Sequence, residues 1–306
     1  MGIDGVACAR AGMKTLRALL ILGRVSNLPT VWSNCLCGWV LVRGTNMDAM
    51  VFGLLITGAT LIYLGGMFLN DACDATWDRE HRAERPIPAG AISEQAVWRI
   101  GIGLMAAGMF FLCLQGGVTA LLSLMLFNTI LVYNFVHKKI TWSPLLIALC
   151  RWWLILIAAA FAHTALGVET AFRDAQEAGQ AAWVALVLFG YVAGLSVLAK
   201  EESTLGAVRF WPCLLLLLPV ARALLMNGAT QWVLLAGGVV LLWVVRCLQF
   251  TFWTEQRDIG RTVGGLLAGM VLLDLLAVAG APTEYAVTFL LLFGLSLAAQ
   301  RWVPAT

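Results

Sequence analysis

Charged residues are scarce in this chain. They make up 12% of its 306 residues, whereas soluble globular domains carry roughly a quarter. No charge-rich stretch is long enough to form a domain outside a membrane. These two shortages exclude a water-soluble enzyme and a receptor with a soluble head. They predict an integral membrane protein that acts in or at the bilayer.

Several other signals are missing as well. The short alternating segments of a membrane β-barrel do not occur. The eight cysteines lack the paired spacing of a metal site, and the three histidines stand alone. A net charge of +3 indicates membrane topology rather than a nucleic-acid partner, and we expect no nucleic acid. The first apolar stretch contains Arg24, Asn27 and Pro29, which a signal peptide would not carry, so we expect no cleavage.

Long apolar blocks are what the chain does contain. Each has about 17 to 25 residues, the length that a helix needs to cross about 30 Å of hydrocarbon. We therefore expect an all-α membrane protein with one domain over residues 1–306, a helical bundle of nine or ten spans. The spans are predicted at roughly 17–42, 49–70, 96–115, 118–136, 144–164, 181–199, 209–227, 231–252, 262–280 and 284–301.

The basic residues gather on one side of this span map. Only three fall near the other side, namely Arg43, Arg173 and Arg222. The positive-inside rule then places both termini and the segment 71–95 in the cytoplasm, and the segment 166–180 outside. We expect a bacterial inner membrane, and an organellar membrane stays open at this point.

The most informative segment follows the second predicted span. If that span continues as a helix, Asp71, Asp74 and Asp78 lie at i, i+3 and i+7, on one face within about 60°. Three stacked carboxylates repel one another unless a cation compensates, and hard oxygen ligands on a rigid helix suit Mg²⁺. Asn70 could ligate the same group. We interpret the segment as half of a diphosphate clamp, in which phosphate oxygens could also be held by Arg79, Arg82 and Arg85.

A known family shows the same pattern. The segment Asn-Asp-x-x-Asp-x-x-x-Asp, followed by Arg-Pro-Ile-Pro-Ala-Gly over 85–90, resembles the first aspartate-rich motif of the UbiA superfamily of intramembrane prenyltransferases. Arg24 and Asn27 resemble the family's first-helix Arg and Asn, and Tyr133 and Lys138 add to a similarity over roughly residues 15–280. The resemblance implies an all-helical bundle around a central cavity. It also implies that Mg²⁺ bridges the aspartates to a polyprenyl diphosphate and that the prenyl group passes to a hydrophobic acceptor.

The second half departs from the family pattern. Such proteins usually carry another Asp-x-x-x-Asp cluster after the sixth span, but residues 191–199 hold no carboxylate, and only Glu201 and Glu202 follow Lys200. These two glutamates are either substitutes for the missing cluster or a solvated helix end. The altered motif, together with Arg151 in the fifth span, resembles the EboC-like branch of the superfamily, which is associated with secondary metabolism.

Charged residues inside the predicted spans indicate which side chains face the interior of the bundle. Arg24 and Arg151 would cost about 2.5–3.5 kcal/mol or more facing lipid, so we expect both to face the bundle interior and to contact diphosphate. Arg246 and Asp274 lie in two neighbouring spans, and we expect them to pair with each other.

Two functions fit these residues, and a third does not. The first is Mg²⁺-dependent prenyl transfer to a hydrophobic or aromatic acceptor within the bilayer, with Asp71, Asp74 and Asp78 holding the metal. Arg82, Lys138 and Arg151 would neutralise the diphosphate. The substrates would also contact a second set, Arg24, Asn27, Asn70, Tyr133, Lys200, Glu201 and Glu202. The alternative is a membrane carrier of an isoprenoid or another secondary metabolite. A third, phosphatidyl transfer, lacks its Asp-Gly-x-x-Ala-Arg pattern here. Acceptor identity, prenyl chain length, protein partners and oligomeric state stay open.

Overall fold

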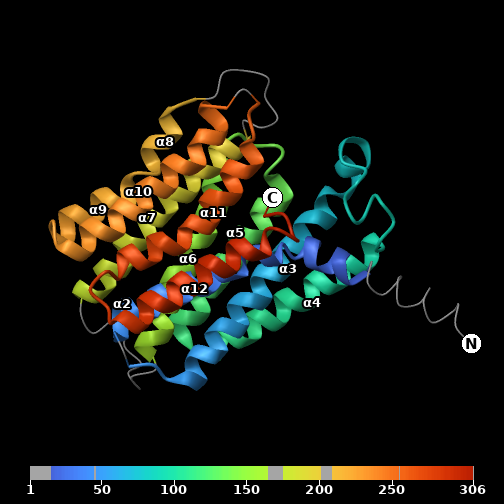
Figure 1. Cartoon of the computed structure of the whole chain (residues 1–306). Helices are drawn as coiled ribbons and strands as arrows, with labels where there is room; N and C mark the ends of the chain where they lie inside the picture. The colour runs from blue at the N-terminus through green and yellow to red at the C-terminus, as the bar shows by residue number, and fades with distance from the viewer. Residues whose placement is uncertain (1–14, 45, 165–174, 201–208, 255, 306) are drawn as a thin grey trace, which may run out of the picture.

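The fold is helical throughout the part of the chain that the structure describes. This computed structural model describes residues 15–44, 46–164, 175–200, 209–254 and 256–305, and no strand occurs among them. Figure 1 shows a bundle of long helices lying side by side. After a helical segment over residues 15–22 and a short 3₁₀ turn, η1 (Val25–Asn27), the helices are α2 (Leu28–Arg43), α3 (Ala49–His81), α4 (Glu94–Cys113), α5 (Gly117–Val136), α6 (Ser143–Thr164), α7 (Ala175–Lys200), α8 (Trp211–Leu215), α9 (Leu218–Asn227), α10 (Gln231–Phe252), α11 (Ile259–Ala277) and α12 (Thr283–Ala299).

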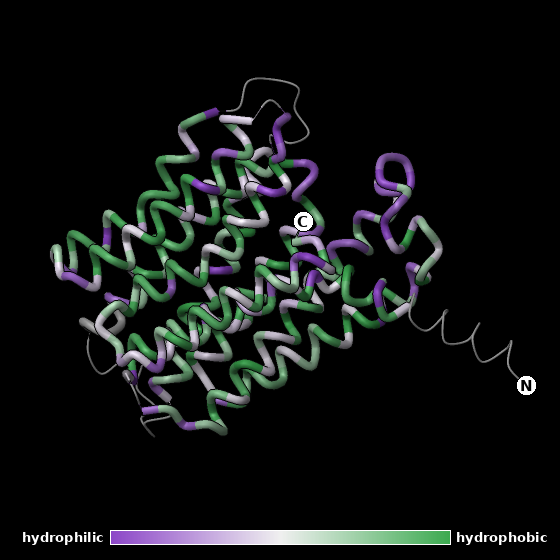
Figure 2. Tube along the Cα trace, in the orientation of Figure 1, coloured by the Kyte–Doolittle hydropathy of each residue, from purple (hydrophilic) through white to green (hydrophobic). Residues whose placement is uncertain are grey.

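Seven of these helices are long and apolar enough to cross a membrane: α3 to α7, α10 and α11. Two shorter apolar segments, Trp211–Asn227 and Thr283–Ala299, fall below that length. An integral, multi-pass membrane protein is therefore confirmed in its coarse form, while the number nine or ten stays a prediction. Figure 2 shows the helices largely green along their length, with hydrophilic residues concentrated toward the α3–α4 connection and the other turns.

Helix α3 is the longest element and carries the aspartates. It starts at a good cap, because the Asp48 side chain accepts hydrogen bonds from the backbone N–H groups of Met50 and Val51. Its 33 residues extend about 50 Å, well beyond about 30 Å of hydrocarbon. Asp71 lies 22 residues after Ala49, about 33 Å along the axis. The helix continues without interruption through the aspartate motif, as expected.

Helices α2 and α6 form the centre of the bundle. Gly38 of α2 allows this packing, because a Cβ there would lie 2.6 Å from the carbonyl oxygen of Ile155 on α6. One apolar core joins α2 and α6 to α3, α4 and α5, and another joins them to α7 and to α9 through α12. The two helices thus belong to both packed halves of the bundle. A cavity lies between these halves, lined by helices from each of them.

The first predicted span is not one helix. The backbone leaves helical geometry at Arg24, whose φ of 41° and ψ of 50° lie in the left-handed region that a non-glycine residue rarely adopts. The turn η1 follows, and α2 begins at Leu28 with Pro29 in its first turn. This break ends one helix beside the cavity and directs the Arg24 side chain toward α3.

Candidate active site

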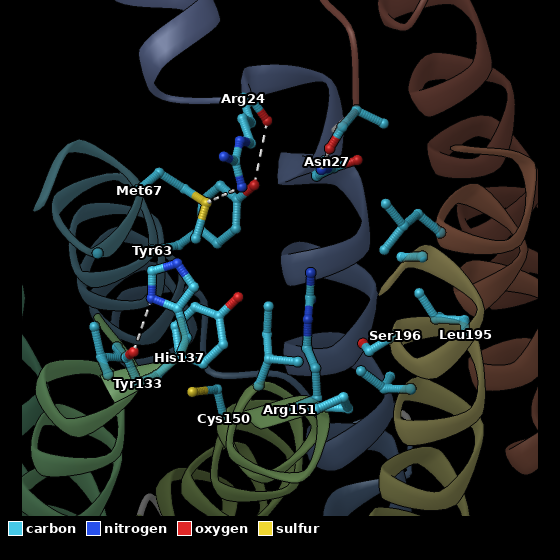
Figure 3. A pocket seen from close by; sticks show the side chains of 18 of the residues that line it. Arg24, Asn27, Tyr63, Met67, Tyr133, His137, Cys150, Arg151, Leu195 and Ser196 are labelled. Carbon is cyan, nitrogen blue, oxygen red and sulfur yellow. Dashed lines mark hydrogen bonds between the residues drawn. The ribbon is translucent and has the colours of Figure 1, made fainter. Parts of the chain in front are cut away.

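A cavity of about 550 Å³ opens among the helices. Its wall comes from α2, α3, α5, α6, α7 and α11, together with the α3–α4 connection and Ala305. Figure 3 shows side chains entering it from several of these helices, with Arg24 and Arg151 on different sides. Its lining combines charged side chains, among them Arg24, Arg85 and Arg151, with apolar side chains such as Ile62, Leu154 and Leu267.

The aspartates are not among the residues that line the cavity: they lie behind Arg24 and Arg85, which do line it, at the end nearest the α3–α4 connection, and we call this end the mouth. All three are buried, with exposures of 5% for Asp71, 8% for Asp74 and 2% for Asp78. Arg85 bridges two of them, because its Nη1 lies 3.3 Å from Asp71 Oδ1 and 3.0 Å from Asp78 Oδ2. Arg24 adds a longer contact of 3.4 Å to Asp71 Oδ1.

The middle aspartate is paired with the end of α5. Lys138 Nζ lies 2.8 Å from Asp74 Oδ1, and His137 Nε2 lies 3.4 Å from the same oxygen. The ammonium of Lys138 also sits 4.2 Å from the centre of the Trp77 ring. Each of the three carboxylates thus has a basic partner supplied by the chain itself.

These ion pairs explain how three carboxylates can lie close together without a bound metal. Their mutual repulsion is offset by Arg24, Arg85 and Lys138, so a metal is not needed to keep the aspartates together. No group of three or more His, Cys, Asp or Glu side chains converges as a metal site among the described residues. The donors nevertheless fit Mg²⁺, because they are carboxylate oxygens and one of them, Asp78 Oδ1, is buried without a hydrogen-bond partner.

Asn70 and its neighbours position the Arg24 side chain. Arg24 Nη2 donates to Asn70 Oδ1 at 3.4 Å and Nη1 to the Met67 sulfur at 3.6 Å. Asn70 Nδ2 donates in turn to Asn134 Oδ1 on α5 at 3.3 Å, and Asn134 donates to the Gly66 carbonyl oxygen at 3.2 Å. Asn70 therefore links the arginine to the helix pair α3–α5.

Other predicted site residues also line the cavity. Arg82 is exposed at the mouth, and its guanidinium lies 5.9 Å from the Trp77 ring, with no aspartate in contact. Tyr133 stacks on His137, with ring centres 4.9 Å apart. Asn27 donates to the Ala305 carbonyl oxygen at 2.9 Å.

The end of α7 approaches the mouth from the opposite half of the bundle. Lys200 lines the cavity and donates to the carbonyl oxygens of Ile140 and Thr141 at 3.1 and 3.2 Å. Ser196 also faces the cavity. Glu201 and Glu202 lie outside the described residues, so their predicted role is not placed by this structure.

Arg151 lies at the other end of the cavity, which we call the deep end. Its Nη1 donates to Asn34 Oδ1 at 2.8 Å and its Nη2 to Thr30 Oγ1 at 2.9 Å, both on α2. Its guanidinium carbon is 6.0 Å from the ring of Tyr63, whose hydroxyl donates to the Arg24 carbonyl oxygen at 3.2 Å. Arg24 and Arg151 are both interior, as expected, but they lie in different surroundings.

The expected pair of Arg246 and Asp274 is wrong. Asp274 is 1% exposed and accepts hydrogen bonds from Ser33 Oγ at 2.6 Å and Asn34 Nδ2 at 2.7 Å. Arg246 is exposed on α10. The acid on α11 faces α2 instead, because the rotation of one helix against another is not contained in their spacing along the chain.

Several contributing residues were not singled out from the sequence. His137 received no role, and Asn34, Ser33 and Asn134 are short polar side chains within apolar segments. Their signal was available, because a polar residue inside a predicted span tends to face the bundle interior. Which partner each one meets could not be read from that signal.

Comparison with known proteins gives a family match over most of the chain. Residues 30–263 match the UbiA prenyltransferase family. A digeranylgeranylglyceryl phosphate synthase from Metallosphaera sedula is 28% identical over 118 residues, 39% of this chain and 42% of that protein. A protoheme IX farnesyltransferase from Alkalihalophilus pseudofirmus is 31% identical over 139 residues, 42% of this chain and 44% of that protein. A 4-hydroxybenzoate octaprenyltransferase from Citrobacter koseri is 26% identical over 149 residues, 48% of each chain. These alignments span less than half of each relative.

Solved structures show the same arrangement of helices over most of the chain. An apo UbiA homolog from Aeropyrum pernix superimposes with a TM-score of 0.64 at 16% identity, covering 83% of this chain and 96% of that one. A UbiA homolog from Archaeoglobus fulgidus, bound to GPP and Mg²⁺, superimposes with a TM-score of 0.59 at 13% identity, covering 94% and 99%. At these identities the likeness establishes the fold and nothing about ligands.

Proposed function

The chain belongs to the UbiA prenyltransferase family, and we propose that it transfers a prenyl group from a polyprenyl diphosphate to a hydrophobic or aromatic acceptor within the membrane. One observation carries the proposal: a single cavity is lined both by apolar side chains and by Arg24 and Arg85, whose guanidinium groups contact the buried Asp71 behind the wall. Such a cavity suits a ligand with a charged head and a hydrocarbon tail. We further propose that the chain belongs to the EboC-like branch, in secondary metabolism.

The residues at the mouth divide the work of binding the diphosphate. Asp71, Asp74 and Asp78 would hold Mg²⁺, which supplies positive charge to the leaving group. When the head group binds, Arg85 and Lys138 exchange their carboxylate partners for phosphate oxygens, which charged donors bind strongly. Arg24, Asn70 and Arg82 would extend this contact, and Asn27, Tyr133 and Lys200 would line the space around the head group.

The bonds that break and form in the proposed reaction belong to the two substrates. The C1–O bond of the donor breaks with both electrons leaving on pyrophosphate, and a nucleophilic atom of the acceptor forms a bond to C1. The acceptor then loses one proton. The protein's contribution is charge stabilisation on the leaving group and exclusion of water from the allylic cation.

The deciding experiment uses the full chain in detergent or nanodiscs. Geranyl diphosphate, Mg²⁺ and a panel of quinone, phenolic, indole and lipid acceptors are supplied, and pyrophosphate release and prenylated product are measured. We expect release that depends on both Mg²⁺ and an acceptor. A protein that neither binds geranyl diphosphate nor releases pyrophosphate would contradict the proposal.

The absence of the second acidic cluster from α7 supports a second candidate function, a carrier of an isoprenoid or another secondary metabolite. Residues 191–199 contain no carboxylate, and Ser196 and Lys200 face the cavity from this helix. If the chain is an enzyme, Glu201 or Glu202 replaces part of the missing cluster. Changing both to Gln should then lower activity about 10²-fold. Tight binding of geranyl diphosphate by the parent, with no release across the panel, would favour the carrier.

We propose that the whole chain is one domain of nine or ten spans in a bacterial inner membrane, with the mouth in the cytoplasm. The clustered arginines of the α3–α4 connection support this orientation. Labelling of a cysteine introduced at Ala83, in intact cells and in a background without other reactive cysteines, tests it. Labelling by an impermeant reagent added outside would reverse the orientation.

A further inference from the structure

Arg151 is a cation inside the membrane-spanning part of the bundle, and its direct partners are neutral. It contacts Asn34 and Thr30 and makes no ion pair within the part of the chain that the structure describes. A charge within a span is costly unless it is paired or faces a polar cavity. Arg151 differs in this respect from Arg24, whose guanidinium contacts Asp71.

A buried acid positions Arg151 without touching it. Asn34 donates to Asp274 through Nδ2 and accepts from Arg151 through Oδ1, so its amide is held in one orientation by both neighbours. Ser33 donates to the same Asp274 oxygen. Asp274 is a positioning residue in this arrangement, because it orients the amide that orients the guanidinium.

The guanidinium keeps donors for a ligand. Arginine has five N–H donors, and two contacts to α2 are formed. Arg151 lines the cavity and has N–H groups beyond these two contacts. A planar fork of this kind is well suited to two oxygens of a carboxylate or phosphate.

Arg151 lies further along α3, toward its N-terminus, than the aspartates do. The Arg151 guanidinium lies over Tyr63, and Tyr63 precedes Asp71 by eight residues on the same helix, about 12 Å along its axis. The mouth already has Arg24, Arg85 and Lys138 for the diphosphate. These three cations can serve the diphosphate, so Arg151 is open to a different ligand.

We propose that Arg151 binds an acidic oxygen of the acceptor, so that the acceptor carries a carboxylate or a phosphate beside its nucleophilic atom. This inference rests on the proposed function. It selects acidic acceptors over neutral alcohols, quinones and indoles, and it assigns the two interior arginines to different substrates.

Matched pairs of probes test the proposal on the full chain in detergent. One pair is 4-hydroxybenzoate and neutral 4-hydroxybenzamide; the other is a geranylgeranylglyceryl phosphate and geranylgeranylglycerol. Affinities are measured by calorimetry for the parent, Arg151→Gln, Arg151→Lys and the matched variant Arg24→Gln. Geranyl diphosphate with Mg²⁺ is measured on the same samples.

We expect the parent to bind the acid of at least one pair about tenfold or more tightly than its neutral partner. Arg151→Gln should remove that preference and change geranyl diphosphate affinity less than about threefold, while Arg24→Gln should do the reverse. The pair that shows the preference distinguishes a carboxylate from a phosphate. If Arg151→Gln does not fold, Arg151→Lys still decides, because it keeps the charge but loses the fork and should lose most of the preference.

Three results would overturn the proposal. The first is a parent without acid preference in either pair. The second is a preference that survives in both Arg151 variants. The third is a loss of geranyl diphosphate binding alone in these variants. A failure of the proposed function looks different: the parent would not bind geranyl diphosphate with Mg²⁺, whatever its preference between acid and neutral probes.

Discussion

The two ends of the cavity handle charge in opposite ways. At the mouth every aspartate is paired, with Arg85 bridging Asp71 and Asp78 and Lys138 holding Asp74. At the deep end Arg151 is held only by neutral groups, and the nearby acid is turned toward other donors. Paired charges can exchange partners when a charged ligand arrives, whereas an unpaired charge offers a place for an anion. The same residue type, arginine, therefore serves different purposes at the two ends.

The largest effect is expected at the mouth, from Asp71→Asn. This change removes a ligand of the proposed metal and leaves Arg24 and Arg85 with a neutral oxygen. Pyrophosphate release should fall about 10²-fold or more, and Mg²⁺ should no longer raise the melting temperature with geranyl diphosphate. Because Asp71 is paired with Arg24 and Arg85, we expect this variant to lose some folding stability. Removing one carboxylate would stabilise the protein only if the aspartates repelled one another without partners. Equal ligand stabilisation in variant and parent would show that the mouth is assigned wrongly.

Arg85→Gln tests how much the ion pairs of Arg85 with two buried aspartates contribute to folding stability and donor affinity. It leaves Asp78, 2% exposed, without its cation, so we expect a loss of about 1–3 kcal/mol in unfolding free energy and about tenfold in donor affinity. Arg79→Gln is the matched control. Arg79 pairs with Glu94 at 2.6 Å where both side chains are exposed, and such pairs contribute under about 1 kcal/mol. Similar effects from both arginines would remove the distinction.

Asp274→Asn probes the deep end without touching a ligand. An Asn in this place keeps an oxygen for Ser33 but no longer fixes the Asn34 amide by charge, so the Arg151 guanidinium loses its orientation. We expect the KM for an acidic acceptor to rise about fivefold while kcat and the KM for geranyl diphosphate stay within about twofold. A variant that changes all three equally would show a merely structural role.

The smallest effect is expected from Lys200→Gln. Lys200 lines the mouth from α7, but it is exposed and bonded to two backbone carbonyl oxygens. Its contribution to diphosphate binding should be screened by water, so we expect a loss of about threefold in donor affinity, larger at low salt. A loss as large as that of Arg85→Gln would mean that Lys200 supplies positive charge in place of a metal ion that the missing acidic cluster would hold.

The sequence predicted the elements better than their contacts. The helix through Asp71, Asp74 and Asp78 follows from their spacing and from the absence of a breaker, and both are local properties. Arg85 is close to them in sequence, but the other two cations come from far along the chain: Arg24 is 47 residues from Asp71 and Lys138 is 64 from Asp74. Spacing cannot give such a partner, because it depends on how helices rotate and pack.

Two interpretations show the same limit. The first span was expected to be continuous over 17–42, but the backbone breaks at Arg24, which has a positive φ. An arginine does not favour this conformation, so no local signal in the sequence indicates the break. Arg246 and Asp274 were expected to pair because both are charged within spans, yet Asp274 faces Ser33 and Asn34. A charge inside a span indicates an interior position. It does not identify the neighbour.

The uninterrupted length of α3 also limits which molecules can react. Tyr63, beside Arg151, and Asp71, beside the proposed diphosphate site, lie on one rigid helix, so their separation of about 12 Å cannot adapt without bending it. The donor's C1 stays close to its diphosphate. An acceptor anchored at Arg151 must therefore present its nucleophile at a distance shorter than that separation. Selection by size would then come from helix geometry rather than from a close-fitting pocket, and acceptors whose acid and nucleophile lie further apart would bind without reacting.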